Sequence, residues 1–206
     1  MGLVQYLKRT SLGQYLKRVL RTLRQWRRPP PLLRMLRKLY MSEVLQPAMI
    51  PEPYRTLYYT AGDEDRWIDL LNASKEFGTW DRDRLAREIL STMLTGGGIF
   101  IEHEGRLVGC ASTCLMAEYK PYAILMYVAL LPEHRGKGLG QALVWETMRV
   151  AQRDRFPGLL LHTETHRYAA VRTYFQLGFL PQFGEQTAGK RVWSAVLNKA
   201  LLNGFE

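Results

Sequence analysis

An apolar run at residues 124–131 leads through a glycine-rich loop into a helical pattern, and this succession restricts the possible folds more than any other part of the chain. The loop carries Gly136, Gly138 and Gly140 at alternate positions, and the apolar residues after it recur at three- and four-residue spacing. The first turn of a helix has unpaired N–H groups and partial positive charge, and glycines keep side chains away from it. The pattern therefore predicts either an anion site or only a tight strand–helix turn with solvated charges.

Two familiar nucleotide-binding loops do not fit this sequence. A Walker A loop would end in Gly-Lys-Ser or Gly-Lys-Thr, which is absent here. The dinucleotide fingerprint needs a different glycine spacing and an acidic residue about twenty positions further on, within a βαβ unit. The loop therefore belongs to another class of anion site, if it binds an anion at all.

The loop resembles the acyl-CoA-binding motif of the GNAT N-acetyltransferase superfamily, Arg/Gln-x-x-Gly-x-Gly/Ala, with Arg135, Gly138 and Gly140 at the defining positions. A second family segment follows at residues 159–179 and ends in Tyr-x-x-x-Gly-Phe. The resemblance covers about residues 55–198. It implies an α+β (α/β) GNAT fold, in which helices flank a central mixed, mostly antiparallel sheet.

The resemblance also implies which residues bind acetyl-CoA as a cosubstrate. In this family the strand before the loop splays from its neighbour, its backbone pairs with the pantetheine arm, and the loop amides hold the pyrophosphate. By position, the pantetheine would lie along Val128, Ala129 and Leu130. The pyrophosphate would lie on Arg135, Gly136, Lys137, Gly138, Leu139, Gly140 and Gln141. Arg167 replaces the usual Asn that contacts the CoA arm, and an Arg there could still reach a phosphate.

Acyl transfer to an amine needs a base, an N–H that binds the oxyanion and a proton donor for the departing thiolate. The resemblance implies that the N–H lies near Leu130 and that Tyr174 is the acid, with packing under the CoA arm as its alternative role. His162 has an ordinary pKa near 6.5, and it stands where several relatives place a Glu, so it is one candidate base. A structural histidine is the alternative. Strand alternation places Glu164 on the same face as His162, and Glu164 is the second candidate base.

Positive charge is concentrated at the N-terminus. The chain has 29 Lys and Arg against 19 Asp and Glu, and a formal net charge of +10. Eleven of the basic residues and none of the acidic ones lie in residues 1–42, which leaves 18 basic against 19 acidic residues elsewhere. A nearly neutral catalytic part does not indicate a strongly charged substrate.

The domain organisation follows from this asymmetry. Residues 1–40 are predicted to form a basic amphipathic extension, with helical spacing up to a proline triplet and a second short amphipathic stretch after it. Residues 41–55, with three prolines, are predicted to be a linker, and residues 56–200 the acyltransferase domain. The extension could lie on an anionic membrane surface or pack as a helix on its own domain or a partner. Nucleic-acid binding and organelle targeting are less favoured alternatives.

The pattern predicts the following elements within the domain. Helices are expected to begin at Asp63 or Asp65 and at Asp81, the second running through Leu94 to a glycine triplet. Strands are expected at residues 56–60, 99–103, 106–115, 124–131, 159–165, 180–183 and 191–197, and the last two would close the sheet as a pair.

The remaining residue types point away from metals and disulfides. Cys110 and Cys114 have a C-x-x-x-C spacing typical of neither a disulfide staple nor a zinc site, so reduced thiols in a cytoplasmic protein are expected. The four histidines do not cluster in the sequence, and we predict no metal.

The sequence as a whole predicts an enzyme, an acyl-CoA-dependent N-acyltransferase that moves an acetyl group directly to a primary amine. A homodimer and a peripheral membrane location stay open as expectations. The alternative is a non-catalytic CoA-binding module whose basic arm binds a membrane or nucleic acid.

Overall fold

The computed structural model describes residues 32–183 and 189–202. The chain divides into two compact units, Met1–Pro31 and Leu32–Glu206, and the described strands and helices belong to the second. The amphipathic helix predicted in residues 1–31, with its membrane, nucleic-acid and targeting alternatives, lies outside the described residues. Among the described residues, the helices are too short or too polar to cross a membrane.

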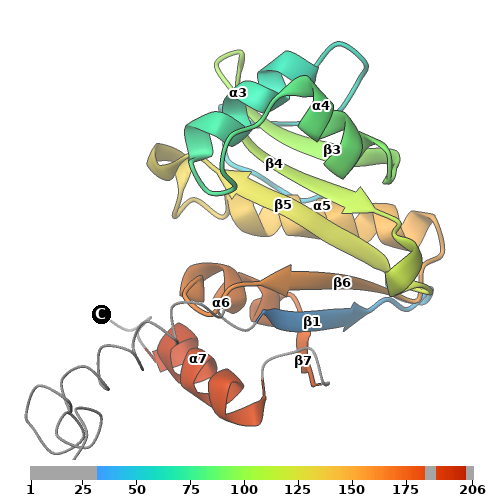
Figure 1. Cartoon of the computed structure of the whole chain (residues 1–206), viewed down its shortest axis with the longest axis vertical. Helices are drawn as coiled ribbons and strands as arrows, with labels where there is room; N and C mark the ends of the chain where they lie inside the picture. Colours follow the sequence, from blue (N-terminus) through green and yellow to red (C-terminus); the bar gives the residue numbers. More distant parts are fainter. Residues whose placement is uncertain (1–31, 184–188, 203–206) are drawn as a thin grey trace, which may run out of the picture. The chain divides into compact units, whose positions relative to one another are not determined.

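A seven-stranded mixed sheet organises the second unit, in the order β2-β3-β4-β5-β6-β1-β7 (Figure 1). Every neighbouring pair is antiparallel except β5 and β6, which are parallel. This confirms the predicted mixed, mostly antiparallel sheet. The strands are β1 Leu33–Lys38, β2 Arg55–Tyr58, β3 Met93–His103, β4 Arg106–Cys114, β5 Ala123–Leu130, β6 Gly158–Thr163 and β7 Leu180–Gln182.

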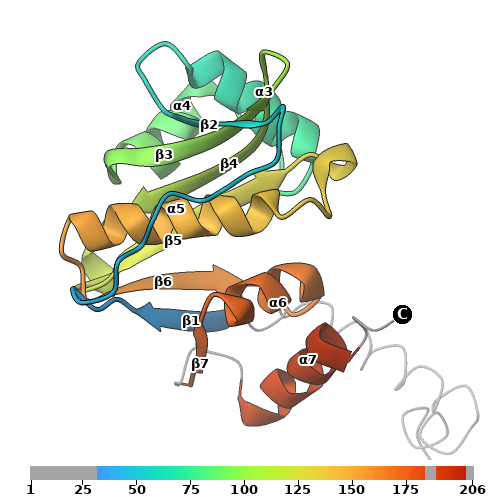
Figure 2. The ribbon, with the colours of Figure 1, turned by 180° about the vertical axis from the view of Figure 1, so that it is seen from behind.

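Helices cover both faces of this sheet. Figure 1 shows α3 and α4 in front of the strands and α5 behind them, and Figure 2 shows the reverse. Helices α6 and α7 pack against each other beyond β6. The helices are α3 Glu64–Ser74, α4 Arg82–Leu85 with a π-helical turn Ala86–Leu90, α5 Leu139–Arg153, α6 Tyr168–Gln176 and α7 Lys190–Leu202, and short 3-10 turns occupy Ala117–Tyr119 and Pro132–His134.

Helix α5 forms because its apolar residues make one buried face, as the spacing predicts. Every residue of that predicted stripe is at most 1% exposed, and the members are Leu139, Leu143, Val144, Met148 and Ala151. On the other face of the sheet, Trp67 of α3 packs edge-on against Phe100 of β3, with 4.9 Å between ring centroids. The predicted helix starts at Asp63 and Asp81 are confirmed as N-caps.

The expected domain boundary after residue 40 is wrong, because residues 33–38 form strand β1 inside the sheet. The strand lies between β6 and β7 and pairs with β6 from Leu33↔Thr163 to Lys38↔Gly158. Leu33 and Met35 are fully buried. A short apolar run fits both helical and strand spacing, so the distant partner β6 decides which one forms. The arm therefore ends at residue 31, and a deletion of residues 1–40 would remove an interior strand of the sheet.

The prediction of a linker at residues 41–55 is also wrong, because this segment lies along α5 (Figure 2). Trp145 Nε1 donates a hydrogen bond to the Gln46 carbonyl at 2.6 Å, and Arg149 Nε donates to the Leu45 carbonyl at 3.1 Å. Prolines prevent regular structure here without making the segment loose, since side chains of α5 satisfy its backbone groups.

The predicted end of the second helix also needs correction. The helix expected over residues 81–94 ends at Leu90, and β3 follows from Met93. The glycine triplet therefore lies within β3, where a Cβ on Gly97 would come within 2.5 Å of the Thr113 carbonyl oxygen. Glycine is needed there for close approach of two backbones, and it does not serve as a helix stop.

The strand predicted at residues 191–197 is wrong, because this region is helix α7. Trp193, Val196 and Ala200 are at most 4% exposed, and their spacing of three and four is that of a helix face. Strand β7 therefore does not pair with residues 191–197 as predicted. It pairs with β1.

Candidate active site

Strands β5 and β6 run together only at their beginnings. Their ladder extends from Ala123↔Leu159 to Leu125↔Leu161, whereas β5 continues to Leu130. Beyond the ladder the two strands diverge, as the arrows in Figure 1 show. The later part of β5 therefore keeps β4 as a neighbour on one side and has no ladder partner in β6 on the other.

A bulge in β5 accompanies this divergence. Tyr127 has a φ of +51°, and the β4–β5 register shifts between Cys110 and Ser112. Bulges bend a strand and turn its backbone groups in new directions. The residues predicted to line a pantetheine arm, Val128 to Leu130, follow directly on this bulge.

The glycine-rich loop leaves open space at the N-terminus of α5. Gly136 and Gly138 both have a φ of +78°, which favours glycine, and Gly138 is the N-cap of the helix. A Cβ built on Gly136, Gly138 or Gly140 would meet no atom within 4 Å. The side chain of Leu139 is buried, so this residue could offer a ligand only its backbone. An extended anion such as a pyrophosphate fits this loop, because no side chain fills the space before the first-turn N–H groups.

A cavity of about 320 Å³ opens between β5, β6, the start of α6 and the loop after α3. It brings together five of the predicted site residues, Val128, His162, Glu164, Arg167 and Tyr174. The polar residues Glu76, Arg84 and Tyr127 also line it.

Tyr174 reaches this cavity from α6. Its residue is 7% exposed, and burial raises the pKa of its hydroxyl to about 12. Among the described residues the hydroxyl has no hydrogen-bond partner, although the ring packs 5.9 Å from that of Phe179. A phenol held neutral in this way can donate its proton to an anion that forms in the cavity.

The two candidate bases, His162 and Glu164, differ in whether a hydrogen bond occupies the atom that would accept the proton. Arg34 Nε of β1 donates to His162 Nε2 at 2.9 Å, and burial together with the Arg34 charge lowers the pKa of His162. Glu164 lies just beyond β6, and its Oε2 accepts from Arg167 Nε at 2.8 Å. Its side chain is 39% exposed, so its carboxylate keeps access to water. The lone pair that His162 would need as a base is therefore occupied, whereas the Glu164 carboxylate has a second oxygen.

The sequence did not single out the residue that links the two arginines of the site. Glu76, on the loop after α3, forms ion pairs with Arg135 and with Arg167. Nothing in the sequence marks Glu76 beyond its place in the loop between α3 and α4. Arg167 thus contacts carboxylates in this structure, where the family pattern has an Asn.

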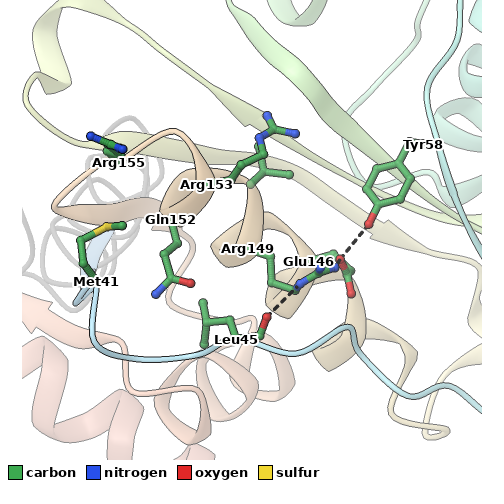
Figure 3. A pocket seen from close by; sticks show the side chains of 9 residues that line it. Met41, Leu45, Tyr58, Glu146, Arg149, Gln152, Arg153 and Arg155 are labelled. Carbon is green, nitrogen blue, oxygen red and sulfur yellow. Dashed lines mark hydrogen bonds and ion pairs between the residues drawn. The ribbon is translucent and has the colours of Figure 1, made fainter.

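A larger cavity, about 460 Å³, lies between α5, β2 and the segment at residues 41–45 (Figure 3). Its central carboxylate, Glu146, is 2% exposed and accepts from the Ala48 amide at 2.7 Å, the Tyr58 hydroxyl at 2.9 Å and Arg149 Nη1 at 2.6 Å. The predicted site residues do not line it. Because residues of α5, β2 and the crossing segment occupy both oxygens of Glu146, we interpret this cavity as a packing seam between α5 and the chain that crosses it.

Comparison with known proteins agrees with this geometry. The sequence model of the acetyltransferase (GNAT) family matches residues 63–179. The mycothiol acetyltransferase of Acidothermus cellulolyticus is 28% identical over 168 residues, which are 72% of this chain and 50% of that protein. That of Thermobispora bispora is 31% identical over 141 residues, which are 63% of this chain and 48% of that protein. The chain spans about half the length of these curated relatives.

Solved structures show the same fold. A GCN5-related N-acetyltransferase from Sphaerobacter thermophilus matches with a TM-score of 0.63 at 19% identity, over 80% of this chain and 53% of that one. The N-acetylglutamate synthase of Neisseria gonorrhoeae, solved with coenzyme A and N-acetyl-glutamate, matches with a TM-score of 0.51 at 19% identity, over 72% of this chain and 33% of that one. Because the family match covers more than half of the chain and includes the splayed strand, the glycine loop and α6, this protein belongs to the acetyltransferase (GNAT) family.

Proposed function

We propose that this protein transfers the acetyl group of acetyl-CoA directly to a primary amine. The observation that carries the proposal is the cavity in which the splayed end of β5 and the buried Tyr174 meet, next to the open glycine loop. This is the set of parts that acyl transfer from a thioester with a phosphate-bearing arm requires: a slot, an anion cradle and an acid.

The cosubstrate would be held by backbone more than by side chains. The pantetheine amides would pair with β5 at residues 128–130, where the β6 side has no ladder partner. The pyrophosphate would lie on the N–H groups of residues 136–141. Lys137 Nζ donates to the Tyr54 hydroxyl at 2.7 Å, so its positive charge is held beside this loop.

Groups on the cavity wall can accept and donate the protons that move during the transfer. An ammonium acceptor gives one proton to Glu164, directly or through water, and the amine nitrogen attacks the thioester carbonyl carbon. A backbone N–H near Leu130 would stabilise the oxyanion. Collapse forms the amide as the nitrogen gives its second proton to water, breaks the C–S bond and leaves the electron pair on sulfur, which takes the proton of Tyr174. Water then returns a proton to Tyr174 and removes one from Glu164.

The surroundings of Tyr174 and Glu164 support their proposed roles as acid and base. Burial raises the pKa of Tyr174 to about 12, which keeps the phenol protonated and ready to donate at neutral pH. Glu164 is favoured over His162 as the base because Arg34 donates a hydrogen bond to His162 Nε2 and opposes its protonation.

The test is a titration of acetyl-CoA by calorimetry, followed by assay of free CoA thiol with a panel of primary amines. The panel includes ethanolamine, tyramine, spermidine and the acceptor of the mycothiol acetyltransferases, which the half-length match makes a candidate. We expect micromolar binding and thiol release that one amine accelerates. Binding without acceleration by any amine would favour the non-catalytic CoA-binding module, and absence of binding would reject both functions.

A further inference from the structure

The carboxylate of Glu76 bridges the two sides of the splayed cavity. Its Oε1 pairs with Nη2 of Arg135, which leads into the glycine loop. Its Oε2 pairs with Nη1 of Arg167, the N-cap residue of α6. One acidic side chain therefore holds two arginines that belong to separate segments, and all three lie at the place where a cosubstrate arm would enter.

The loop that carries Glu76 is firmly held. The Asn72 side chain both accepts from the Trp80 amide at 2.7 Å and donates to the Trp80 carbonyl at 3.0 Å, which closes the loop on itself. Arg84 Nη1 donates to the Phe77 carbonyl at 2.9 Å. The ring of Phe77 in turn lies 5.1 Å from the Arg167 guanidinium carbon. Glu76 therefore keeps its position in the cavity when one of its arginines changes partner.

Arg135 and Arg167 differ in how many carboxylates they contact and in how exposed their side chains are. Arg167 has a second carboxylate, Glu164, at 2.8 Å, and its side chain is 22% exposed. Arg135 pairs with Glu76 alone among the described carboxylates, and its side chain is 49% exposed. Arginine binds phosphate oxygens with two parallel hydrogen bonds, so a pyrophosphate on the neighbouring loop would compete for Arg135 first.

Loss of Arg135 would leave Glu76 Oε1 without its cation. Glu76 and Glu164 would then share the single cation of Arg167, and because the Glu76 side chain is only 22% exposed, the excess negative charge is costly. The group that restores the balance is a cation in the cavity, and an amine acceptor reaches the cavity as an ammonium ion. The site would thus gain affinity for the acceptor at the moment the cosubstrate binds.

We propose that Glu76 is an acceptor-binding residue, which pairs with Arg135 and Arg167 in the free protein and with the acceptor ammonium once phosphates have drawn Arg135 away. The inference rests on the proposed N-acyltransferase function, and it adds the residue that binds the acceptor ammonium and the exchange of ion partners at Glu76 that couples this binding to the cosubstrate. Glu164 cannot provide this coupling, because it contacts Arg167 and not Arg135.

The first test uses the unaltered chain. The best amine of the panel is titrated by calorimetry into the free protein and into protein saturated with CoA, which holds the phosphates but has no acyl group to transfer. We expect the amine to bind at least about tenfold more tightly when CoA is present. Equal affinity in the two titrations would overturn the inference.

The second test compares Glu76→Gln with Glu133→Gln. Gln keeps the shape of Glu76 but removes the charge that competes for Arg135, so acetyl-CoA should bind about 3- to 10-fold more tightly. The KM of the amine should rise at least about tenfold, with kcat changed far less. Glu133 is exposed beside the glycine loop and contacts neither arginine, so its variant should change both constants by less than about twofold.

The outcomes separate the inference from the function on which it rests. If the unaltered protein binds no acetyl-CoA, the proposed function and the inference both fail. If it binds and turns over while Glu76→Gln behaves like Glu133→Gln, only the inference fails. A melting temperature for each variant accompanies these measurements, and the titration on the unaltered chain decides the matter if Glu76→Gln does not fold.

Discussion

The two cavities described above both contain a glutamate among arginines, and they differ in what that glutamate contacts. In the larger one, Glu146 is 2% exposed and accepts from a backbone amide, a phenol and an arginine of its own helix. In the smaller one, Glu76 joins two arginines from segments that no other described carboxylate connects. Glu146 is satisfied by groups packed around it, whereas Glu76 and its two arginines form ion pairs that a ligand could redistribute.

Volume therefore does not identify the active site here. The cavity of about 460 Å³ lies between an irregular segment and a helix, and its polar groups tie the two together. The cavity of about 320 Å³ lies where β5 has no ladder partner in β6, and its Glu76 pairs with Arg135, which leads into the open glycine loop. Unpaired backbone and exchangeable ion pairs indicate binding, and completed hydrogen bonds indicate structure.

The largest expected effect is a loss of acetyl-CoA affinity when the glycine loop beside the smaller cavity is altered. Gly138→Glu should weaken acetyl-CoA binding by at least about 100-fold, because the substitution strains a left-handed residue and places a carboxylate against the phosphates. Gly105→Glu is the matched control, since Gly105 has a φ of +79°, open space around it and a place in the β3–β4 turn. Calorimetric titration of both variants checks this. Equal loss of binding in the two would show that strain, and not the loop, is responsible.

A pair of tyrosine variants tests chemistry against structure. Tyr174→Phe should lower kcat by about 30- to 100-fold with little change in melting temperature, because it removes a proton donor whose hydroxyl makes no hydrogen bond in the described chain. Tyr58→Phe should do the opposite, because it removes a 2.9 Å hydrogen bond to Glu146. We expect it to cost about 1–2 kcal/mol of stability and to leave kcat unchanged. Steady-state kinetics and thermal melts on both proteins provide the comparison. Unchanged turnover in Tyr174→Phe would remove that residue from the mechanism.

Glu146→Gln tests the structural interpretation of the larger cavity. The amide keeps the shape but not the charge, so Arg149 loses its ion partner at 2.6 Å in a site where the glutamate side chain is 3% exposed. Since the Arg149 side chain is 30% exposed, we expect a loss of about 2 kcal/mol in the free energy of unfolding, below the cost of a fully buried pair. Denaturant unfolding measures it, with acetyl-CoA affinity as the second readout. A fall in that affinity of more than about threefold would contradict the assignment.

The smallest effect concerns His162 on the wall of the smaller cavity. His162→Gln should keep kcat within about threefold, because the amide oxygen can accept from Arg34 as the ring nitrogen does. Steady-state kinetics with the best amine of the panel measures the change. A loss of about 100-fold, on the order expected for removal of a general base, would restore His162 to that role.

The His162→Gln variant should also change how the melting temperature depends on pH. Burial lowers the pKa of His162 in the folded protein, so its stability contribution is full above an unfolded pKa of about 6.5 and is lost as pH falls through the lower folded value. The drop in melting temperature between neutral pH and about pH 5 should therefore be smaller in His162→Gln. Part of the drop should remain, because the pKa of His134 is also lowered by burial.

Local patterns predicted the parts of the site that depend on backbone. Glycines at alternate positions, an apolar run before them and a helical stripe after them located the open loop at the start of α5, since φ and hydrophobic period are properties of nearby residues. The family resemblance added the roles proposed for Tyr174 and the β5 backbone. By contrast, nothing near Glu76 in the sequence indicated that Arg135 and Arg167, which lie 59 and 91 residues away, would meet at its carboxylate.

The glycine loop and the position of α5 could be predicted from the amino-acid sequence because they rest on short-range periodicity, and the spaced motifs indicated the family, whose resemblance implied the mixed sheet. Three other features became visible only in the folded chain: the strand at residues 33–38 between β6 and β7, the helix at residues 190–202 and the carboxylate that joins the two arginines of the site. These three share one cause. A short apolar run or an isolated charge has several acceptable partners, and the choice among them is made by burial and pairing with segments far away in the chain.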